Sequence, residues 1–172
     1  KSNDLESLYY IGVKTKQFEV FTKNGFLFPK TPYKSIGILN SFKIHGHQAS
    51  YGAKSYNVMQ YSGYMNLIYQ TVIGNTDHTI KFGGSWVYDN YDKNLNESYK
   101  FGKIESVPGA FVEYAYNAQK KTALVLGLRG DHHNTHGAFI TPRAHYKYNF
   151  TDRSAFRLSA GRGFRTANPI IE

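Results

Sequence analysis

The chain has 172 residues, a length that fits one domain, and it lacks cysteine, which excludes disulfide scaffolds, thiolate metal sites and cysteine nucleophiles. Lys and Arg exceed Asp and Glu by nine charges, but the basic residues are dispersed and no nucleic-acid-binding module is recognisable, so nucleic acid is not an expected partner. Tyrosine, phenylalanine and glycine are frequent, and no run of roughly 18 apolar residues is present that would form a transmembrane helix. Such a composition, with alternating polarity, is typical of a membrane β-barrel.

The first third of the chain predicts two strands separated by a turn region. Over residues 8–21 the alternation of apolar and polar residues is interrupted, so we expect a partly buried or protruding strand. A Lys-Asn-Gly turn signal occupies residues 23–25, and two prolines bracket a loop at 29–32. Alternation returns from Ser35, and residues 47–54 are expected to form the next loop.

The middle of the chain predicts three further strands. A long alternating stretch covers residues 56–73, and the tight turn expected at 74–77 leads into a strand over 80–88. Residues 89–106 are polar and tyrosine-bearing, so they are expected to form the longest connection. Another strand follows over 107–117.

The last third has the most regular alternation and predicts three consecutive strands, over 122–131, 140–150 and 156–165. A bulge or an interfacial position is expected at Arg162, which interrupts the pattern. The apolar face of these strands is expected to hold Leu124, Leu126, Leu128, Ile140, Ala144, Tyr146, Tyr148, Phe150, Phe156, Leu158, Ala160 and Phe164.

We therefore predict an all-β fold, an antiparallel up-and-down transmembrane β-barrel segment of about eight strands. Short turns alternate with longer loops along the chain, apart from the proline-bearing hairpin near Lys30, as in outer-membrane barrels. By that logic, the turns near Asn75, Gln119 and Thr151 are expected on the periplasmic side. The loops near Ser50, Asn94 and Asn134 mark the outside.

Several sequence phrases are more specific than this periodicity. Together they resemble the middle of the barrel of TonB-dependent outer-membrane receptors and are most similar to receptors of the Bacteroidetes lineage. The resemblance covers nearly the whole chain from Phe18. Its phrases are FEVFTKNG at 18–25, SIG at 35–37, NLIYQ at 66–70, PGAFVEY at 108–114, GLRGD at 127–131, TPR at 141–143 and RLSAGRGFRTAN at 157–168.

The resemblance implies a barrel of about 22 strands around an N-terminal plug, whose TonB box engages the energy-coupling protein TonB. Neither plug nor TonB box is recognisable, and both ends look cut, so residues 1–172 are expected to be a partial barrel domain. The implied activity is TonB-driven uptake of a scarce ligand, such as a ferric siderophore, haem or corrinoid, across the outer membrane of a Gram-negative bacterium. The implied partners are the receptor's own plug, TonB, outer-membrane lipid and a small-molecule ligand such as a metal chelate or corrinoid; no cofactor is implied.

Three alternatives stay open at this point: a passive porin or structural barrel, a glycan importer, and an outer-membrane hydrolase. The hydrolase would need a triad of Ser159, His145 and Asp131, which share one strand parity. Because no GxSxG motif or oxyanion loop accompanies them, an enzyme is not expected and no residue is assigned a catalytic role.

A row of charged side chains is expected to face the lumen or the plug, where charges need partners such as a cross-strand Arg–Asp pair. An anion-attracting wall is one interpretation, and plug docking with barrel rigidity is the favoured one. The row consists of Arg129, Asp131, Arg143, His145, Arg157 and Arg165.

The nearest approach to a metal constellation is Asp131 with His132, His133 and His136, where imidazoles and a carboxylate would be suitable ligands. A polar external loop is the favoured interpretation, so no metal is expected. Aromatic residues are expected to form interfacial girdles, although those at the external strand ends are suited to stacking on a ligand. The candidate ligand-binding residues are Tyr88, Asp89, Tyr91, His133 and His136.

Overall fold

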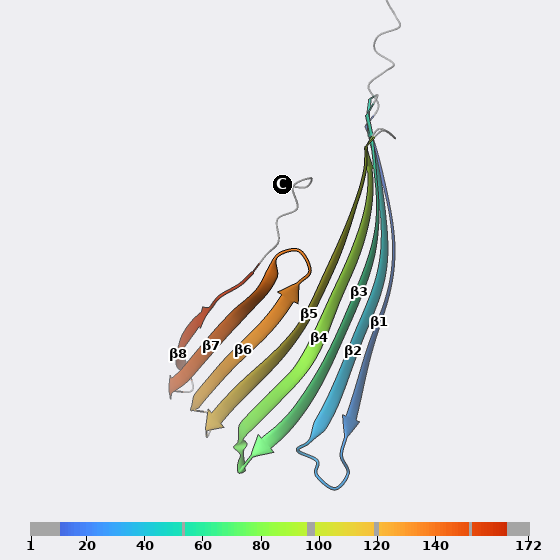
Figure 1. Cartoon of the computed structure of the whole chain (residues 1–172). Coiled ribbons are helices and arrows are strands. Elements are labelled where there is room, and N and C mark those ends of the chain that lie inside the picture. The colour runs from blue at the N-terminus through green and yellow to red at the C-terminus, as the bar shows by residue number, and fades with distance from the viewer. Residues whose placement is uncertain (1–10, 53, 96–98, 119–120, 152, 165–172) are drawn as a thin grey trace, which may run out of the picture. The chain divides into compact units, whose positions relative to one another are not determined.

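The computed structural model describes residues 11–52, 54–95, 99–118, 121–151 and 153–164. These residues form one antiparallel sheet in which each strand pairs with its neighbours in sequence (Figure 1). This confirms the predicted all-β, up-and-down fold of about eight strands. No helix that is long and apolar enough to cross a membrane occurs in the described residues. The strands are β1 (Ile11–Leu27), β2 (Ser35–Tyr51), β3 (Lys54–Ile73), β4 (Asn75–Leu95), β5 (Tyr99–Ala118), β6 (Thr122–His133), β7 (Gly137–Thr151) and β8 (Ser154–Gly161).

The strands in the middle of the sheet are longer than the sequence predicts. β3, β4 and β5 have 20, 21 and 20 residues, whereas roughly 9–11 residues suffice to cross a bilayer. The predicted loops at 47–54 and 89–106 are therefore wrong, because most of their described residues continue the strands. An antiparallel ladder satisfies its own backbone groups, so polar sequence extends a strand into water as readily as it forms a loop.

The predicted turn at 23–25 is also wrong, because β1 continues to Leu27. The chain reverses over 28–34 instead, where the Thr31 amide donates to the Phe28 carbonyl at 3.0 Å and the Lys34 amide to the Thr31 carbonyl at 2.8 Å. Proline has no N–H to donate to a ladder, so the predicted proline-bearing loop at 29–32 is the segment that ends the strand.

Three glycines with positive φ lie at strand ends: Gly52 at 59°, Gly74 at 73° and Gly137 at 78°. Gly74 alone separates β3 from β4, which confirms a tight turn at the predicted position. The β6–β7 hairpin is also short, because only residues 134–136 separate its strands, in contrast to the longer loop expected near Asn134. The reversal over 28–34 is longer than either of these two turns. The expected turn at Gln119 lies outside the described residues.

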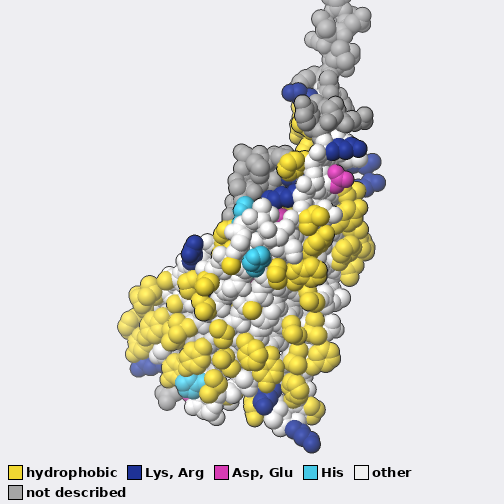
Figure 2. Space-filling view, in the orientation of Figure 1, with side chains coloured by type: hydrophobic (Ala, Val, Ile, Leu, Met, Phe, Trp, Pro, Cys, Tyr) yellow, Lys and Arg dark blue, Asp and Glu magenta, His cyan; other side chains and the backbone are white. Residues whose placement is uncertain are grey.

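The strands divide into two compact units. The first unit comprises Lys1–Lys23, Leu39–Met65 and Trp86–Val107, and the second comprises Asn24–Ile38, Asn66–Ser85 and Pro108–Glu172. Ala49 is the only buried hydrophobic residue among those described, while every strand exposes large apolar side chains. Figure 2 shows such side chains covering much of the visible surface. The large apolar side chains are therefore exposed and do not form a core, which suits a sheet with a lipid-facing surface.

The strand register of the second unit agrees with the predicted faces. Leu126 lies opposite Ala144, and Tyr146 lies opposite both Leu124 and Leu158, which aligns apolar residues across β6, β7 and β8. The intervening positions align polar residues, such as Arg129 opposite Thr141. Because alternate residues of a strand point to opposite faces, the second unit has one apolar face and one polar face.

Phe164 departs from the predicted alternation. β8 ends at Gly161, and the Arg162 amide donates to the Pro142 carbonyl at 3.0 Å. The Phe164 ring stacks on Phe139, with 3.9 Å between ring centroids, so it lies with a residue of the polar parity of β7. The expectation for Phe164 is wrong because a period of two applies only while the strand continues.

Candidate functional site

An arginine–aspartate pair dominates the polar face of β6. Arg129 Nε donates to both carboxylate oxygens of Asp131, at 2.9 and 2.7 Å, and Nη2 donates to Oδ1 at 2.6 Å. The same Nη2 also donates to Ser85 Oγ on β4, at 2.7 Å. Asp131 is only 8% exposed. The expected cross-strand Arg–Asp pair is therefore a pair along one strand, which is anchored to β4 through a serine.

Gly109 on β5 gives this pair its space. It lies directly opposite Asp131 in the ladder. A Cβ atom at this position would sit 2.0 Å from Asp131 Oδ1 and 3.1 Å from Arg129 Nη2. Because glycine has no side chain, the Asp131 carboxylate and the Arg129 guanidinium can lie over β5. The guanidinium thereby reaches Ser85 on β4, the strand beyond β5.

A second ion pair crosses β6 in the same manner. Glu113 and Arg143 are both register partners of Gly127, which lies between them. Arg143 Nη2 donates to Glu113 Oε2, and Lys81 Nζ lies 3.4 Å from Glu113 Oε1. A Cβ atom on Gly127 would approach Arg143 Nε to 2.7 Å and Cγ to 2.8 Å. Arg143 thus reaches Glu113 because the strand between them carries a glycine.

The residues of the hydrolase alternative do not assemble. His145 Nδ1 and Ser159 Oγ lie 3.0 Å apart on directly opposite residues of β7 and β8. Asp131, however, is bound by Arg129 and lies opposite Phe139, which is six residues from His145 along β7, or about 20 Å. The orienting carboxylate of a triad is therefore absent from this histidine.

Arg157, another member of the predicted inner row, lies directly opposite Lys147. Like charges in directly opposed positions repel each other, so this pair favours an anionic neighbour. The last member of the row, Arg165, lies outside the described residues.

A pocket of ≈ 620 Å³ opens on the polar face of the second unit. It contains the two ion-paired arginines and three phenylalanines, two of which are the stacked Phe139 and Phe164. Asn66 also lines it, and its Oδ1 atom is buried without a hydrogen-bond partner in the described part of the chain. The pocket therefore presents a hydrogen-bond acceptor, the Asn66 oxygen, together with ion-paired arginines and aromatic rings to a group bound in it.

The predicted histidines close the hairpin between β6 and β7. His133 is 2% exposed, and its Nδ1 accepts a hydrogen bond from the Thr135 amide at 3.0 Å. Its ring packs on His136 with 4.7 Å between centroids, and His136 lies 6.4 Å from Phe164. No group of three or more His, Asp or Glu side chains suited to holding a metal occurs within the described ranges.

The first unit has a polar network around Asp89. Ser62 Oγ donates to Asp89 Oδ1 at 2.5 Å, and Gln60 Nε2 donates to the same oxygen at 3.1 Å and to the Tyr91 hydroxyl at 3.3 Å. Lys93 Nζ lies 5.3 Å from the centre of the Tyr91 ring. The structure thus brings the predicted candidates Asp89 and Tyr91 together and adds Gln60 and Ser62.

Tyr88 does not belong to this network. Its ring lies 5.9 Å from Trp86, two residues earlier on β4, so it shares the exposed aromatic face. Adjacent strand residues point to opposite faces, so the Tyr88 side chain lies on the face opposite Asp89 and Tyr91, and its role in ligand binding stays a prediction. Tyr91 lies past the aromatic pair, outside the apolar band. Burial, together with Asp89 and Glu105, raises the pKa of Tyr91 to about 12, so its hydroxyl stays protonated at neutral pH.

Sequence reasoning missed Gln60, Ser62, Ser85 and Glu113. The first three are common polar residues whose partners depend on the register between distant strands. Glu113 carried a usable signal, since it is the only acidic residue in the strand predicted over 107–117. A single carboxylate facing a row of arginines is a natural ion-pair partner.

Comparison with known proteins agrees with this arrangement. The family model described as TonB dependent receptor-like, beta-barrel matches residues 6–171, which is nearly the whole chain. No curated protein and no solved structure matches the chain. A continuous antiparallel sheet with exposed apolar side chains and an ion-paired polar face is the wall that such a barrel requires. The chain therefore belongs to the β-barrel family of TonB-dependent receptors, which are outer-membrane transporters.

Proposed function

We propose that this chain forms part of the barrel wall of a receptor that imports a scarce ligand, driven by TonB through a plug domain. The proposed ligand class is a ferric siderophore, haem or corrinoid. The observation that carries this proposal is the network of Gln60, Ser62, Asp89 and Tyr91. Recognition of one scarce solute requires donors and acceptors in fixed positions, and these hydrogen bonds hold them in place.

The topology supports the proposal that residues 1–172 are only part of a larger barrel in a Gram-negative outer membrane. β1 and β8 are the two edges of the eight-stranded sheet. An unpaired edge cannot remain in the hydrocarbon region, because its backbone donors and acceptors would have no partner there. Further strands of the parent receptor are therefore proposed to pair with both edges.

The polar face of the second unit is proposed to contact the receptor's own plug. Arg129 and Arg143 are neutralised by Asp131 and Glu113, so they fit wall rigidity better than anion attraction. The opposed cations Lys147 and Arg157 lack such a carboxylate among the described residues. An acidic group of the plug would relieve their repulsion, and a donor would satisfy the buried Asn66 oxygen.

Replacing Asp89 with Asn and Tyr91 with Phe is expected to raise the ligand concentration for half-maximal uptake about tenfold or more. Losing a hydrogen bond to a charged group costs roughly 1.5–3 kcal/mol. The measurement is uptake by cells that produce the full receptor, tested with ferric siderophores, haem, a corrinoid and a maltooligosaccharide. Tyr88→Phe is the matched control, because this side chain lies on the opposite face and its loss of a hydroxyl should leave uptake unchanged.

The same cells with inactivated TonB separate the proposed function from its alternatives. Active import predicts that uptake stops, whereas uptake that continues at the same rate would indicate a passive porin. Uptake of the maltooligosaccharide alone would favour the glycan importer. If the Asp89 and Tyr91 variant needs the same ligand concentration for half-maximal uptake as the Tyr88→Phe control, for every substrate tested, this network does not bind the ligand.

A further inference from the structure

The face of the first unit that carries Trp86 changes its chemistry along the strands. Apolar residues give way to polar ones in three of its strands, and the polar residues lie toward the β2–β3 and β4–β5 connections. Such a boundary marks the place where a membrane-spanning sheet passes from hydrocarbon into the headgroup region. The change runs from Val20 and Phe18 to Lys16 and Lys14 in β1, from Trp86 and Tyr88 to Asp92 and Asn94 in β4, and from Ile104 to Lys100 in β5.

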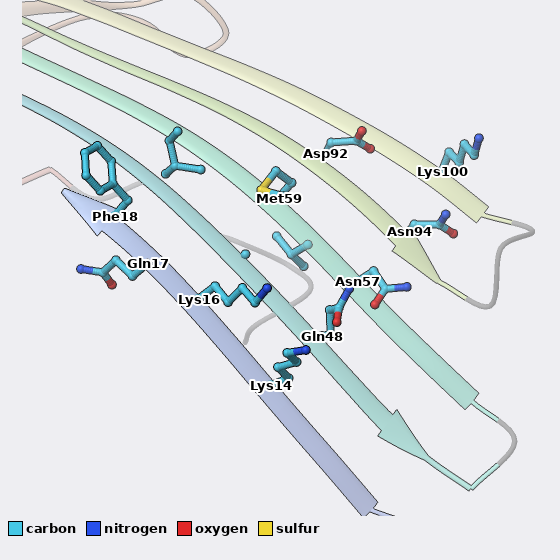
Figure 3. A pocket seen from close by; sticks show the side chains of 13 residues that line it. Lys14, Lys16, Gln17, Phe18, Gln48, Asn57, Met59, Asp92, Asn94 and Lys100 are labelled. Carbon is cyan, nitrogen blue, oxygen red and sulfur yellow. The ribbon is translucent and has the colours of Figure 1, made fainter.

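A pocket of ≈ 650 Å³ lies at this boundary. Figure 3 shows lysines and an exposed phenylalanine from β1, a methionine from β3 and a further lysine from β5 around it. Phe18 is 59% exposed and Met59 is 41% exposed, so apolar surface is accessible beside the cations. The pocket therefore combines an apolar patch with a cationic rim, which is the complement of an anionic amphiphile.

Gly46 keeps part of this pocket open. A Cβ atom there would be in ordinary contact with Met59 Sδ and Cε, both at 3.7 Å. Any longer side chain at this position would extend into the space that Met59 borders. The hollow thus depends on a small residue in β2.

We propose that this pocket binds the phosphorylated headgroup of an outer-leaflet lipid. Lys14, Lys16 and Lys100 contact the phosphate, and an acyl chain lies over Phe18 and Met59. The three lysines face one carboxylate in the pocket, that of Asp92, so cationic charge prevails. The inference requires the β2–β3 and β4–β5 connections to lie on the outer side of the membrane, and it does not depend on which solute the receptor imports.

The test compares full receptors reconstituted in phosphatidylcholine nanodiscs that contain a small fraction of lipid A. Native mass spectrometry counts the lipid A molecules that remain bound per receptor. The variant Lys14→Gln, Lys16→Gln, Lys100→Gln is expected to lose at least tenfold in lipid A retention, and replacing the same three lysines with arginine should restore it. The matched control changes Lys23, Lys30 and Lys54 to Gln, which removes equal charge at exposed residues outside the pocket.

Gly46→Leu provides an independent test, because it fills the pocket without changing charge and should lower retention as well. Solute uptake should be unchanged in every variant, which separates failure of this inference from failure of the proposed transport. Equal retention by the wild type and the glutamine variant would overturn the inference. So would equal loss in the control variant, or complete displacement of lipid A by millimolar inorganic phosphate, which would indicate a site for free anions.

Discussion

Replacing Leu126 with arginine is expected to destabilise the folded receptor barrel by about 2–4 kcal/mol, the cost of an arginine at the bilayer midplane. Leu126 is 44% exposed on the apolar face and is the fifth residue of β6. That places it about 13 Å along the strand, near the middle of an apolar band of roughly 25 Å. The measurement is equilibrium unfolding of the full receptor by denaturant in lipid vesicles.

The control for this prediction is Val125→Arg, because Val125 lies next to Leu126 but points to the polar face, opposite His145. An arginine there meets water or the plug, so its cost should be clearly smaller. Equal costs at the two positions would contradict the assignment of faces. A neutral Leu126→Arg would show that this position does not meet hydrocarbon.

Replacing Gly83 with alanine is expected to cost about 1–3 kcal/mol of unfolding free energy or more, as overpacking does in a tightly packed site. A Cβ atom at Gly83 would lie 1.9 Å from the Leu67 carbonyl oxygen and 3.1 Å from the Phe111 ring. A backbone carbonyl cannot rotate away as a flexible side chain does, so β3 itself would have to move. The measurement is the same unfolding experiment.

The adjacent Gly84 supplies the control, because its Cβ would meet only the Gly109 carbonyl oxygen at 3.5 Å, an ordinary contact. Gly84→Ala should be tolerated. It should even raise the unfolding free energy slightly, because alanine lowers the conformational entropy of the unfolded chain. If both alanines are tolerated equally, the close approach of β3 and β4 at Gly83 is not present in the folded receptor.

The faces of the strands were predictable because they follow from a period of two. Leu126 and Arg129 could be assigned to opposite faces without any knowledge of their neighbours. The partners of Arg129 were not predictable, since Ser85 lies 44 positions earlier in the chain and meets it only through the pairing of β4, β5 and β6. The glycines that make room for these contacts, Gly109 and Gly127, have no local signal for that role.

Strand ends were the other weak point. The polar stretches at 47–54 and 89–106 resemble loops in composition, yet most of their described residues belong to long strands. Hydrophobic alternation reports the part of a strand that meets lipid, and it stops where the strand enters water. For this reason Asp89 and Tyr91 were expected in a loop, although both belong to β4.

The most direct test of this account is a spin-label accessibility scan of β6 in the reconstituted receptor, using single cysteines at residues 123–128. The chain has no cysteine of its own, so each label in it is unique. Labels at 124, 126 and 128 should be accessible to oxygen dissolved in the bilayer. Labels at 123, 125 and 127 should be shielded from oxygen by the plug or accessible to a water-soluble nickel chelate. Oxygen accessibility without a period of two, or with the two sets exchanged, would contradict the account of a barrel wall with its polar face turned inward.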